Sequence, residues 1–436
     1  MTTGVAANIV HDPATGQLTY TAGLDVGNGY VKGLVRQTGK TKGGYVIDMP
    51  SVVTRMTRPN QVPTPDAEAP LVVEDDFVNS IDVTFASPLV GDTYRRLAGV
   101  RALTSRGSLD EFTLVGNTSK AHQELSKVLV LTALAATAVR EATSTLGHIP
   151  GSVNGDPAAL TVSATVALAL PITEYVSHRD AYAAAFTGGR GGRLTHTVTV
   201  GNFETPVTVR IVFNDVVVIA EGASAQYAIS AGGVKMADAM LADVRKRGLV
   251  LDGITGADVL AATNTIGIDV GEGTVNFPVF TAGKFNTDAS RTLGQGYGTV
   301  LEHAIESMDD DGFAHGFTSR KQLADYLQTP PTALKKNFHA RVGAYVEREA
   351  DFFVEEVAGE FARVLADVGA LTEVGYVYGG GSGPLRGVLH DVLLRTASQI
   401  NSEDTFPVLY LDASYSRKLN REGLQLAAEK IAARSA

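Results

Sequence analysis

Two short segments in different halves of the chain have nearly the same sequence. Residues 23–29 read GLDVGNG and residues 267–273 read GIDVGEG, with identical residues at five of the seven positions. In each segment an apolar strand is expected to lead to an aspartate and then to a glycine-rich turn. Glycine has no Cβ atom, so the backbone N–H groups of such a turn can approach and bind a phosphate. The repeat predicts two phosphate-binding hairpins, one in each half of the chain.

The aspartates of the two segments, Asp25 and Asp269, stand at the ends of their strands, where they can face a metal ion. Magnesium keeps much of its hydration shell, so a carboxylate can hold it through bound water. Both aspartates are therefore predicted to bind Mg²⁺ through water. For each aspartate the alternative is a residue that only caps its own turn, and the repetition favours the metal role.

A third glycine cluster lies near the end of the chain. Residues 374–378 are an expected strand that runs directly into residues 379–384, of sequence GGGSGP. Proline is favoured in the first turn of a helix, so a helix is expected to begin here. A strand–glycine–helix junction lets a flat base or an anion lie against the backbone. The residues that would make such contacts at this junction are Gly379, Gly380, Gly381, Ser382 and Pro384.

Strands and helices alternate along the chain and must position these turns. A strand–turn–strand begins at Thr265, and further strands are expected over residues 21–26, 30–35, 45–49, 160–170, 207–213, 216–220, 374–378 and 407–411. Helices are expected over residues 119–144, 172–186, 221–247, 298–308, 319–327, 340–368, 384–398 and 419–433. This alternation predicts an α/β fold with two domains.

Composition limits the classes of protein that fit. The 436 residues carry a formal net charge of −10, and direct binding of nucleic acid needs a basic face. The sequence has no cysteine, which excludes disulfides, iron–sulfur clusters and thiolate zinc sites. Residues 1–20 contain no lysine, arginine or apolar run, and the apolar stretch 128–139 is too short to span a bilayer. A cytoplasmic protein without a membrane partner is expected.

Two other nucleotide-binding motifs are excluded. Gly39-Lys40-Thr41 looks like the end of a P-loop, but that motif needs a glycine at position 34, which is Leu34. Neither repeated segment completes the dinucleotide-binding fingerprint, because the final glycine is missing. The chain is therefore not expected to bind NAD.

Taken together, the glycine segments resemble the nucleotide-binding motifs of the actin superfamily. Residues 25–32 resemble its first phosphate motif, residues 269–274 its second and residues 376–384 its adenosine motif, in the same order and at similar distances. Within the superfamily, the chain looks most like the bacterial ParM-type plasmid-segregation actins. Residues 170–179, 218–227 and 420–424 also resemble segments of these proteins. The resemblance covers roughly residues 21–430, with residues 50–115 poorly matched.

The resemblance implies an actin-like α/β fold, in which two duplicated mixed-sheet domains flank a nucleotide cleft. Domain I would span residues 21–221 and be completed by residues 407–436, domain II would span residues 222–406, and residues 1–20 would be an N-terminal extension. The bound group would be ATP with Mg²⁺. Besides the third glycine cluster, the residues implied to contact it are Asp25, Gly27, Asn28, Gly29, Tyr30, Lys32, Asp269, Gly271, Glu272, Gly273, Thr274 and Gly296.

The resemblance also implies catalytic roles. Glu221 stands where the family has a glutamate or glutamine that orients the attacking water, and Asp269 would act with it; the alternative for Glu221 is an acid favoured by a helix N-terminus. Lys32 would reach the β- and γ-phosphates as a point charge, or is a solvated lysine on a strand. Gly296 lies in residues 294–298, which either line the nucleotide or form a plain turn before the next helix.

The second phosphate motif departs from the family pattern at two positions. After Thr274 the family usually has threonine and then aspartate, whereas this chain has Val275 and Asn276. The departure concerns contacts with the γ-phosphate and the geometry of the turn more than nucleotide binding itself.

The function implied by the resemblance is a filament-forming ATPase that drives plasmid segregation by polymerisation. Water would attack the γ-phosphate of ATP in line. The partners would be further copies of the chain, since head-to-tail contacts that do not close generate filaments. A DNA-binding adaptor protein is expected as well, because the chain itself is acidic. The alternatives are a non-polymerising phosphotransferase of the sugar- or acetate-kinase type and a membrane or cytoskeletal scaffold on the same fold.

Overall fold

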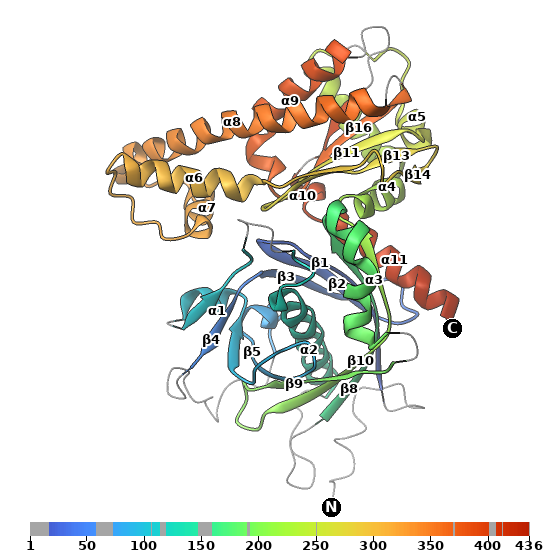
Figure 1. The fold of residues 1–436 in the computed structure, drawn as a ribbon, viewed down its shortest axis with the longest axis vertical. Coiled ribbons are helices and arrows are strands. Elements are labelled where there is room, and N and C mark those ends of the chain that lie inside the picture. The colour runs from blue at the N-terminus through green and yellow to red at the C-terminus, as the bar shows by residue number, and fades with distance from the viewer. Residues whose placement is uncertain are drawn as a thin grey trace, which may run out of the picture. The chain divides into compact units, whose positions relative to one another are not determined.

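A computed structural model of the chain describes residues 17–57, 73–105, 107–113, 119–146, 159–189, 192–249, 251–368, 371–400, 407–411 and 413–435. They form two units (Figure 1). Unit 1 comprises Met1–Leu170, Ser177–Ile219 and Arg421–Ala436, and unit 2 comprises Pro171–Val176 and Ala220–Asn420. Of the predicted N-terminal extension, residues 1–16 lie outside the described residues.

Within the described residues, unit 1 contains a ten-stranded mixed sheet. Its strand order is β3-β2-β1-β8-β10-β9-β5-β6-β4-β7, and β1 pairs antiparallel with β2 and parallel with β8. The strands are β1 (Leu18–Val26), β2 (Tyr30–Gln37), β3 (Tyr45–Pro50), β4 (Val53–Met56), β5 (Asp82–Ala86), β6 (Arg95–Ala98), β7 (Ser108–Asp110), β8 (Ala159–Leu170), β9 (Thr195–Val200) and β10 (Val207–Ala220).

Helix α2 (Glu124–Leu146) lies in the core of unit 1. Val128, Leu129, Val130 and Leu131 follow one another along the helix, and each is at most 1% exposed. Four successive residues point in different directions around a helix, so α2 is buried on every side. The apolar stretch at residues 128–139 is therefore a core helix, and none of the described helices is long and apolar enough to cross a membrane. The other helices with residues in unit 1 are η3 (Phe77–Asn79), α1 (Val100–Thr104), α3 (Ile172–Thr187) and α11 (Leu419–Ser435).

Unit 2 contains, among the described residues, a seven-stranded mixed sheet. Strand β11 pairs antiparallel with β12 and β13 and parallel with β16, which pairs in turn with β17. The strands are β11 (Thr265–Val270), β12 (Val275–Phe277), β13 (Val279–Thr281), β14 (Lys284–Phe285), β15 (Arg291–Leu293), β16 (Val374–Tyr378) and β17 (Val408–Tyr410). The helices are α4 (Ala223–Lys246), α5 (Gly256–Ala261), α6 (Tyr297–Asp310), α7 (Arg320–Gln328), η4 (Ala333–Lys335), α8 (Lys336–Val368), α9 (Ser382–Ile400) and α10 (Ala413–Ser416).

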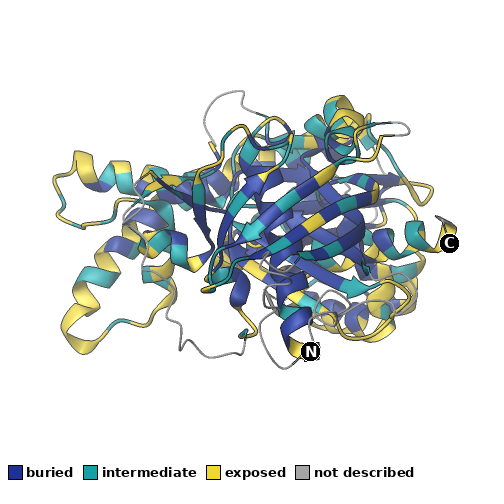
Figure 2. Cartoon of the chain, turned by 90° about the horizontal axis from the view of Figure 1, so that it is seen from below, coloured by how far each residue is buried: buried dark blue, intermediate teal, exposed yellow. Residues whose placement is uncertain are grey.

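The sheet of unit 2 has an apolar layer on each face. In β16, Tyr376 and Tyr378 pack in a cluster with α4 and α5, whereas Val377 packs in a cluster with α6, α8 and α9. Successive side chains of a strand point to opposite faces of its sheet, so one strand contributes to both clusters. Figure 2 shows the strands mainly as buried and the exposed residues gathered on helices and loops. Both faces of the sheet are thus covered, as expected for an α/β fold.

Three details differ from the prediction. The expected strands 207–213 and 216–220 are one strand, β10, in which the polar Asn214 and Asp215 are exposed. The expected helix 221–247 begins at Ala223 and is broken at Gly233, whose φ is 72°. Residues 407–436 are not one segment of domain I, because β17 pairs with β16 in unit 2 and only α11 from Arg421 belongs to unit 1. The pattern of a buried strand does not reveal which sheet edge it will join.

Helix α11 packs against β1 at a position that only glycine can occupy. The Gly23 N–H group donates to Gln425 Oε1 at 2.9 Å, and a Cβ atom at Gly23 would lie 2.2 Å from the backbone nitrogen of Gln425. Gly23→Ala is therefore expected to destabilise unit 1 by about 1–3 kcal/mol through overpacking, measured as a lower midpoint of thermal unfolding.

Gly359→Ala is the matched control for this substitution. Gly359 lies inside α8, where a Cβ atom would meet no described atom within 4 Å. Alanine is favoured over glycine in a helix by roughly 0.5–1 kcal/mol, so this variant should be as stable as the wild type or more so. Equal unfolding midpoints for the Gly23 variant and the wild type would contradict the packing described here.

Candidate functional site

The first repeated segment forms the predicted hairpin in unit 1. The Gly27 N–H group donates to Tyr30 O at 3.0 Å and closes the turn between β1 and β2. Ser51 supports the turn, since its hydroxyl donates to Gly27 O at 2.6 Å and its N–H group donates to Gly29 O at 2.9 Å. Gly27, Asn28 and Gly29 are the residues between the two strands.

Asp25 and Lys32 lie directly opposite each other in this hairpin. They are register partners on β1 and β2, next to the turn. Asp25 is buried, with 7% of its surface exposed, and Lys32 is half-buried. An acidic and a basic residue are therefore neighbours on paired strands, at the end of the sheet where the phosphate-binding turn is predicted.

The second repeated segment forms an equivalent hairpin in unit 2. The Gly271 N–H group donates to Thr274 O at 2.9 Å, the counterpart of the bond between Gly27 and Tyr30 in unit 1. Asp269 is the register partner of Asn276, so Asn276 has the place that Lys32 has in the first hairpin. The repeat in the sequence is thus a repeat of backbone geometry, and the prediction of two hairpins is confirmed.

The other predicted glycine segments of unit 2 converge on this second turn. The Gly381 N–H group donates to Val270 O at 2.8 Å, which joins the third glycine cluster to the end of β11. The Tyr297 N–H group donates to Gly271 O at 3.0 Å, and the Gly298 N–H group donates to Glu272 O at 2.7 Å. Gly296 precedes these two residues as the N-cap of α6. Residues 271–274, 294–298 and 379–384 therefore form one cluster, which we call the glycine cluster of unit 2.

Glu221 lies beside Asp269 at the edge of this cluster. It stands in the short turn between β10 and α4, and Asn276 Nδ2 donates to Glu221 Oε2 at 3.1 Å. The next residue, Gly222, packs so closely on β11 that a Cβ atom there would lie 3.2 Å from the Cβ atom of Asp269. Two acidic residues from distant parts of the sequence are thereby held at the same end of the sheet.

Asp269 has a defined polar environment of its own. Asn420 Nδ2 donates to Asp269 Oδ2 at 2.8 Å, and the Ser224 hydroxyl orients Asn420 by donating to its Oδ1 at 3.0 Å. Burial raises the pKa of the Tyr378 phenol well above its usual value, and the charge of Asp269 raises it further. The phenol therefore stays protonated and donates to Gly222 O at 2.8 Å, which holds the Glu221–Gly222 turn against the sheet.

Two predicted nucleotide contacts have side chains that are engaged within the protein. The Glu272 carboxylate accepts from Arg320 Nε at 2.7 Å, so it ties the turn to α7. The Ser382 hydroxyl donates to Gly379 O at 2.8 Å inside the junction that leads to α9. These side chains stabilise the turns, and the nucleotide contacts at Glu272 and Ser382 stay a prediction.

Asp25 and Asp269 are the acidic residues predicted to hold magnesium through water. Among the described residues, no group of three or more histidine, aspartate or glutamate side chains could hold a metal directly. Magnesium bound with ATP usually takes only one or two carboxylates, with phosphates and water supplying the other ligands. The magnesium roles of Asp25 and Asp269 stay a prediction.

Sequence reasoning gave no role to three residues that the structure brings to the site. Ser51 supports the first turn, Asn420 binds Asp269, and Asn276 binds Glu221. A signal for Asn276 was present in the repeat, because it follows Asp269 by the same interval as Lys32 follows Asp25. No comparable pattern in the sequence points to Ser51.

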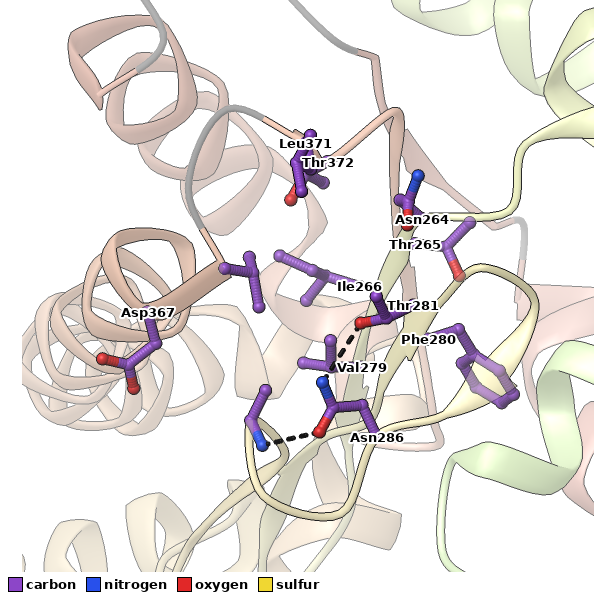
Figure 3. Close-up of a pocket in the computed structure, with 12 residues that line it drawn as sticks. Asn264, Thr265, Ile266, Val279, Phe280, Thr281, Asn286, Asp367, Leu371 and Thr372 are labelled. Atoms are coloured by element: carbon purple, nitrogen blue, oxygen red, sulfur yellow. Dashed lines mark hydrogen bonds between the residues drawn. The ribbon is translucent and has the colours of Figure 1, made fainter.

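A separate cavity of about 210 Å³ lies in unit 2 at the other end of β11 (Figure 3). Asn264 and Thr265 at the start of the strand, Thr281, Asn286 and Leu371 are among the residues that line it. Asn286 Nδ2 donates to Thr281 Oγ1 at 3.1 Å across one side. Asp269 stands at the opposite end of the same strand, so this cavity is not the predicted nucleotide site.

The chain has the actin-like fold. Residues 23–223 match the family model described as the N-terminal domain of actin-like proteins. Solved structures that resemble the chain over nearly its whole length include ParM proteins and the actin-like protein Alp7A. The predicted resemblance to the ParM-type actins is thereby confirmed at the level of the fold.

Three of these structures give the extent of the similarity. Bacillus thuringiensis ParM with ATP has a TM-score of 0.54 and 15% identity, and the match covers 94% of this chain and 98% of that one. Alp7A has a TM-score of 0.58 and 14% identity, with 96% and 98% covered. A non-polymerisable quadruple mutant of pCBH ParM has a TM-score of 0.57 and 16% identity, with 94% and 99% covered. A search of curated proteins found no match.

Proposed function

We propose that this protein is an ATPase that assembles into filaments and drives plasmid segregation through a DNA-binding adaptor protein. The observation that carries the proposal is the repeated hairpin. Each copy has an aspartate at the end of a strand and a turn closed by the same backbone hydrogen bond. The likeness of the fold to ParM with ATP supports it, as does the glycine cluster of unit 2.

In this proposal, both halves of the chain contribute to ATP binding. Backbone N–H groups of residues 28–30 and 272–274 bind phosphate oxygens, while those of Gly27 and Gly271 close the turns. Lys32 adds a positive charge at the β- and γ-phosphates. Asp25 and Asp269 hold Mg²⁺ through its water ligands. The adenosine lies against the backbone of residues 379–384.

The chemistry is the in-line attack of water on the γ-phosphate. Bound magnesium would neutralise charge on the phosphates. The protein's own part is to position the attacking water and the γ-phosphate and to stabilise the transition state. The Glu221 carboxylate accepts a hydrogen bond from the attacking water, aligns it with the phosphorus atom and takes up its proton. The new bond joins the water oxygen to phosphorus, the bond to the β-phosphate oxygen breaks, and ADP and inorganic phosphate leave.

Hydrolysis would control how long a filament persists. A nucleotide shifts the equilibrium between two arrangements of a protein only by the difference in its affinity for them. A difference of a few kcal/mol between ATP and ADP is enough to favour assembly before hydrolysis and disassembly after it. The negative net charge of the chain makes an adaptor protein the expected link to DNA.

The test is assembly and phosphate release measured with ATP, with ADP and without nucleotide. With ATP, the wild type is expected to sediment, to show filaments in negative-stain electron microscopy and to release phosphate. Asp269→Ala is expected to lose most of both activities, because it removes a magnesium-facing carboxylate. Asp269→Asn, which keeps a side chain of the same size beside Asn420, separates loss of charge from loss of packing.

Each outcome has a consequence for the proposal. The absence of polymer under all three conditions would contradict the proposed filament function. Phosphate transfer to a small acceptor without polymer would indicate the phosphotransferase alternative. Normal hydrolysis by Asp269→Ala would remove the assigned role of this residue.

A further inference from the structure

Asn276 makes four hydrogen bonds that join separate elements of unit 2. Its Nδ2 donates to Glu221 Oε2 at 3.1 Å and to Thr274 Oγ1 at 3.2 Å. Its Oδ1 accepts from the Ile172 N–H group at 3.3 Å and from the Thr292 hydroxyl at 2.9 Å. The side chain is only 2% exposed. An amide offers two N–H donors and two lone pairs, so this buried side chain uses its full hydrogen-bonding capacity.

These partners fix which way the amide points. Ile172 begins α3, so its N–H group has no acceptor within the helix and must find one elsewhere. A rotated amide would place an N–H group against the Ile172 N–H group and its oxygen against the Glu221 carboxylate, so both contacts would become repulsive. The Nδ2 group is therefore held toward Glu221, and a fully satisfied buried network of this kind is rigid.

An aspartate at this position would give the opposite interaction. A carboxylate has only acceptors, so it would present an oxygen to the Glu221 carboxylate instead of a donor. The family pattern has aspartate here, and Asp269 already stands directly opposite as the register partner. Asparagine thus provides a donor to Glu221 at a place where the charge of an aspartate would repel it.

We propose that Asn276 is the positioning residue for Glu221, holding its carboxylate in the orientation that directs the attacking water. The proposal rests on the proposed function, in which Glu221 performs that task. Thr292 supports it by fixing the Asn276 amide. The asparagine at position 276, where the family motif has aspartate, then helps this chain to align the attacking water.

The experiment measures kcat and KM for ATP, with thermal unfolding of each variant. Asn276→Asp and Asn276→Ala are expected to lower kcat about 10- to 100-fold, because small errors in alignment of the water are costly. KM should change less than about threefold, since ATP binding is not altered. Asn286→Ala removes another hydrogen-bonded asparagine of unit 2, which is half-buried at the distant cavity, and should leave kcat unchanged.

A second pair of variants keeps the test valid if Asn276 is needed for folding. Thr292→Val removes the hydroxyl that orients the amide and is expected to lower kcat by roughly two- to tenfold. Thr292→Ser retains a hydroxyl and should restore activity toward that of the wild type. Equal kcat for the valine and serine variants would overturn the proposal.

A double-mutant cycle distinguishes positioning from a general structural effect. In a Glu221→Gln background, Asn276→Ala should cause little further loss, because the group that it positions no longer acts. Independent, multiplicative losses would overturn the inference. If the Glu221→Gln single variant is fully active, the assigned role of Glu221 is wrong. If the Asn276 variants are fully active while Glu221→Gln is impaired, this inference is wrong and the proposed function stands.

Discussion

Replacing Glu221 with glutamine is expected to lower the rate of ATP hydrolysis by roughly two to four orders of magnitude, the usual contribution of a group that handles the proton of the nucleophile. Glutamine has nearly the shape of glutamate, and its side-chain oxygen can still accept from Asn276 Nδ2, which lies 3.1 Å from the present carboxylate. The loss therefore reports the missing charge and proton acceptor. Phosphate release in single-turnover and steady-state assays measures it.

ATP binding and assembly should survive this substitution. The turns predicted to hold the phosphates are closed by backbone bonds that do not involve the Glu221 side chain. Filaments of Glu221→Gln formed with ATP are thus expected to persist longer than those of the wild type. Glu204→Gln, at an exposed glutamate outside the site, is the control for a change of one charge. Hydrolysis at the wild-type rate by Glu221→Gln would show that another group orients the water.

Local sequence was sufficient to predict the hairpins and most elements of the fold. The repeated aspartate–glycine segments predict their own turns because the chemistry of a tight turn is local, and the structure confirms both. The apolar stretch at residues 128–139 predicts a helix, which the structure shows to be buried in the core. The actin-like fold was predicted from the order of three short motifs, and the comparisons confirm it.

Contacts between distant residues were not predictable in the same way. That Asn276 reaches Glu221, or that Asn420 reaches Asp269, depends on sheet register and on the path of the chain between elements. The membership of β17 in the sheet of unit 2 depends on which strand edge is available to it. A single sequence encodes these pairings through the whole packing of the unit, so inspection of local patterns cannot recover them.

Gly379→Ala is expected to be strongly destabilising and to weaken nucleotide binding. Gly379 has a φ of 97°, which costs a residue with a Cβ atom about 1–2 kcal/mol. That Cβ atom would also lie 2.4 Å from Val270 O and 2.5 Å from Asp269 Oδ1, and overpacking of this kind costs about 1–3 kcal/mol. The combined effect should lower the unfolding midpoint by roughly 5–15 °C and weaken ATP binding about tenfold or more.

Gly383→Ala, in the same glycine cluster, should behave in the opposite way. A Cβ atom at Gly383 would meet no described atom within 4 Å, and the residue lies in the first turn of α9. Alanine there should be neutral or stabilising by roughly 0.5–1 kcal/mol. Each variant adds one methyl group to the wild type, at positions four residues apart, so composition and charge are matched. If both bind ATP with the wild-type affinity, the backbone of the glycine cluster of unit 2 does not form the nucleotide site; if only Gly379→Ala fails, the close approach of β11 to this junction is what the site requires.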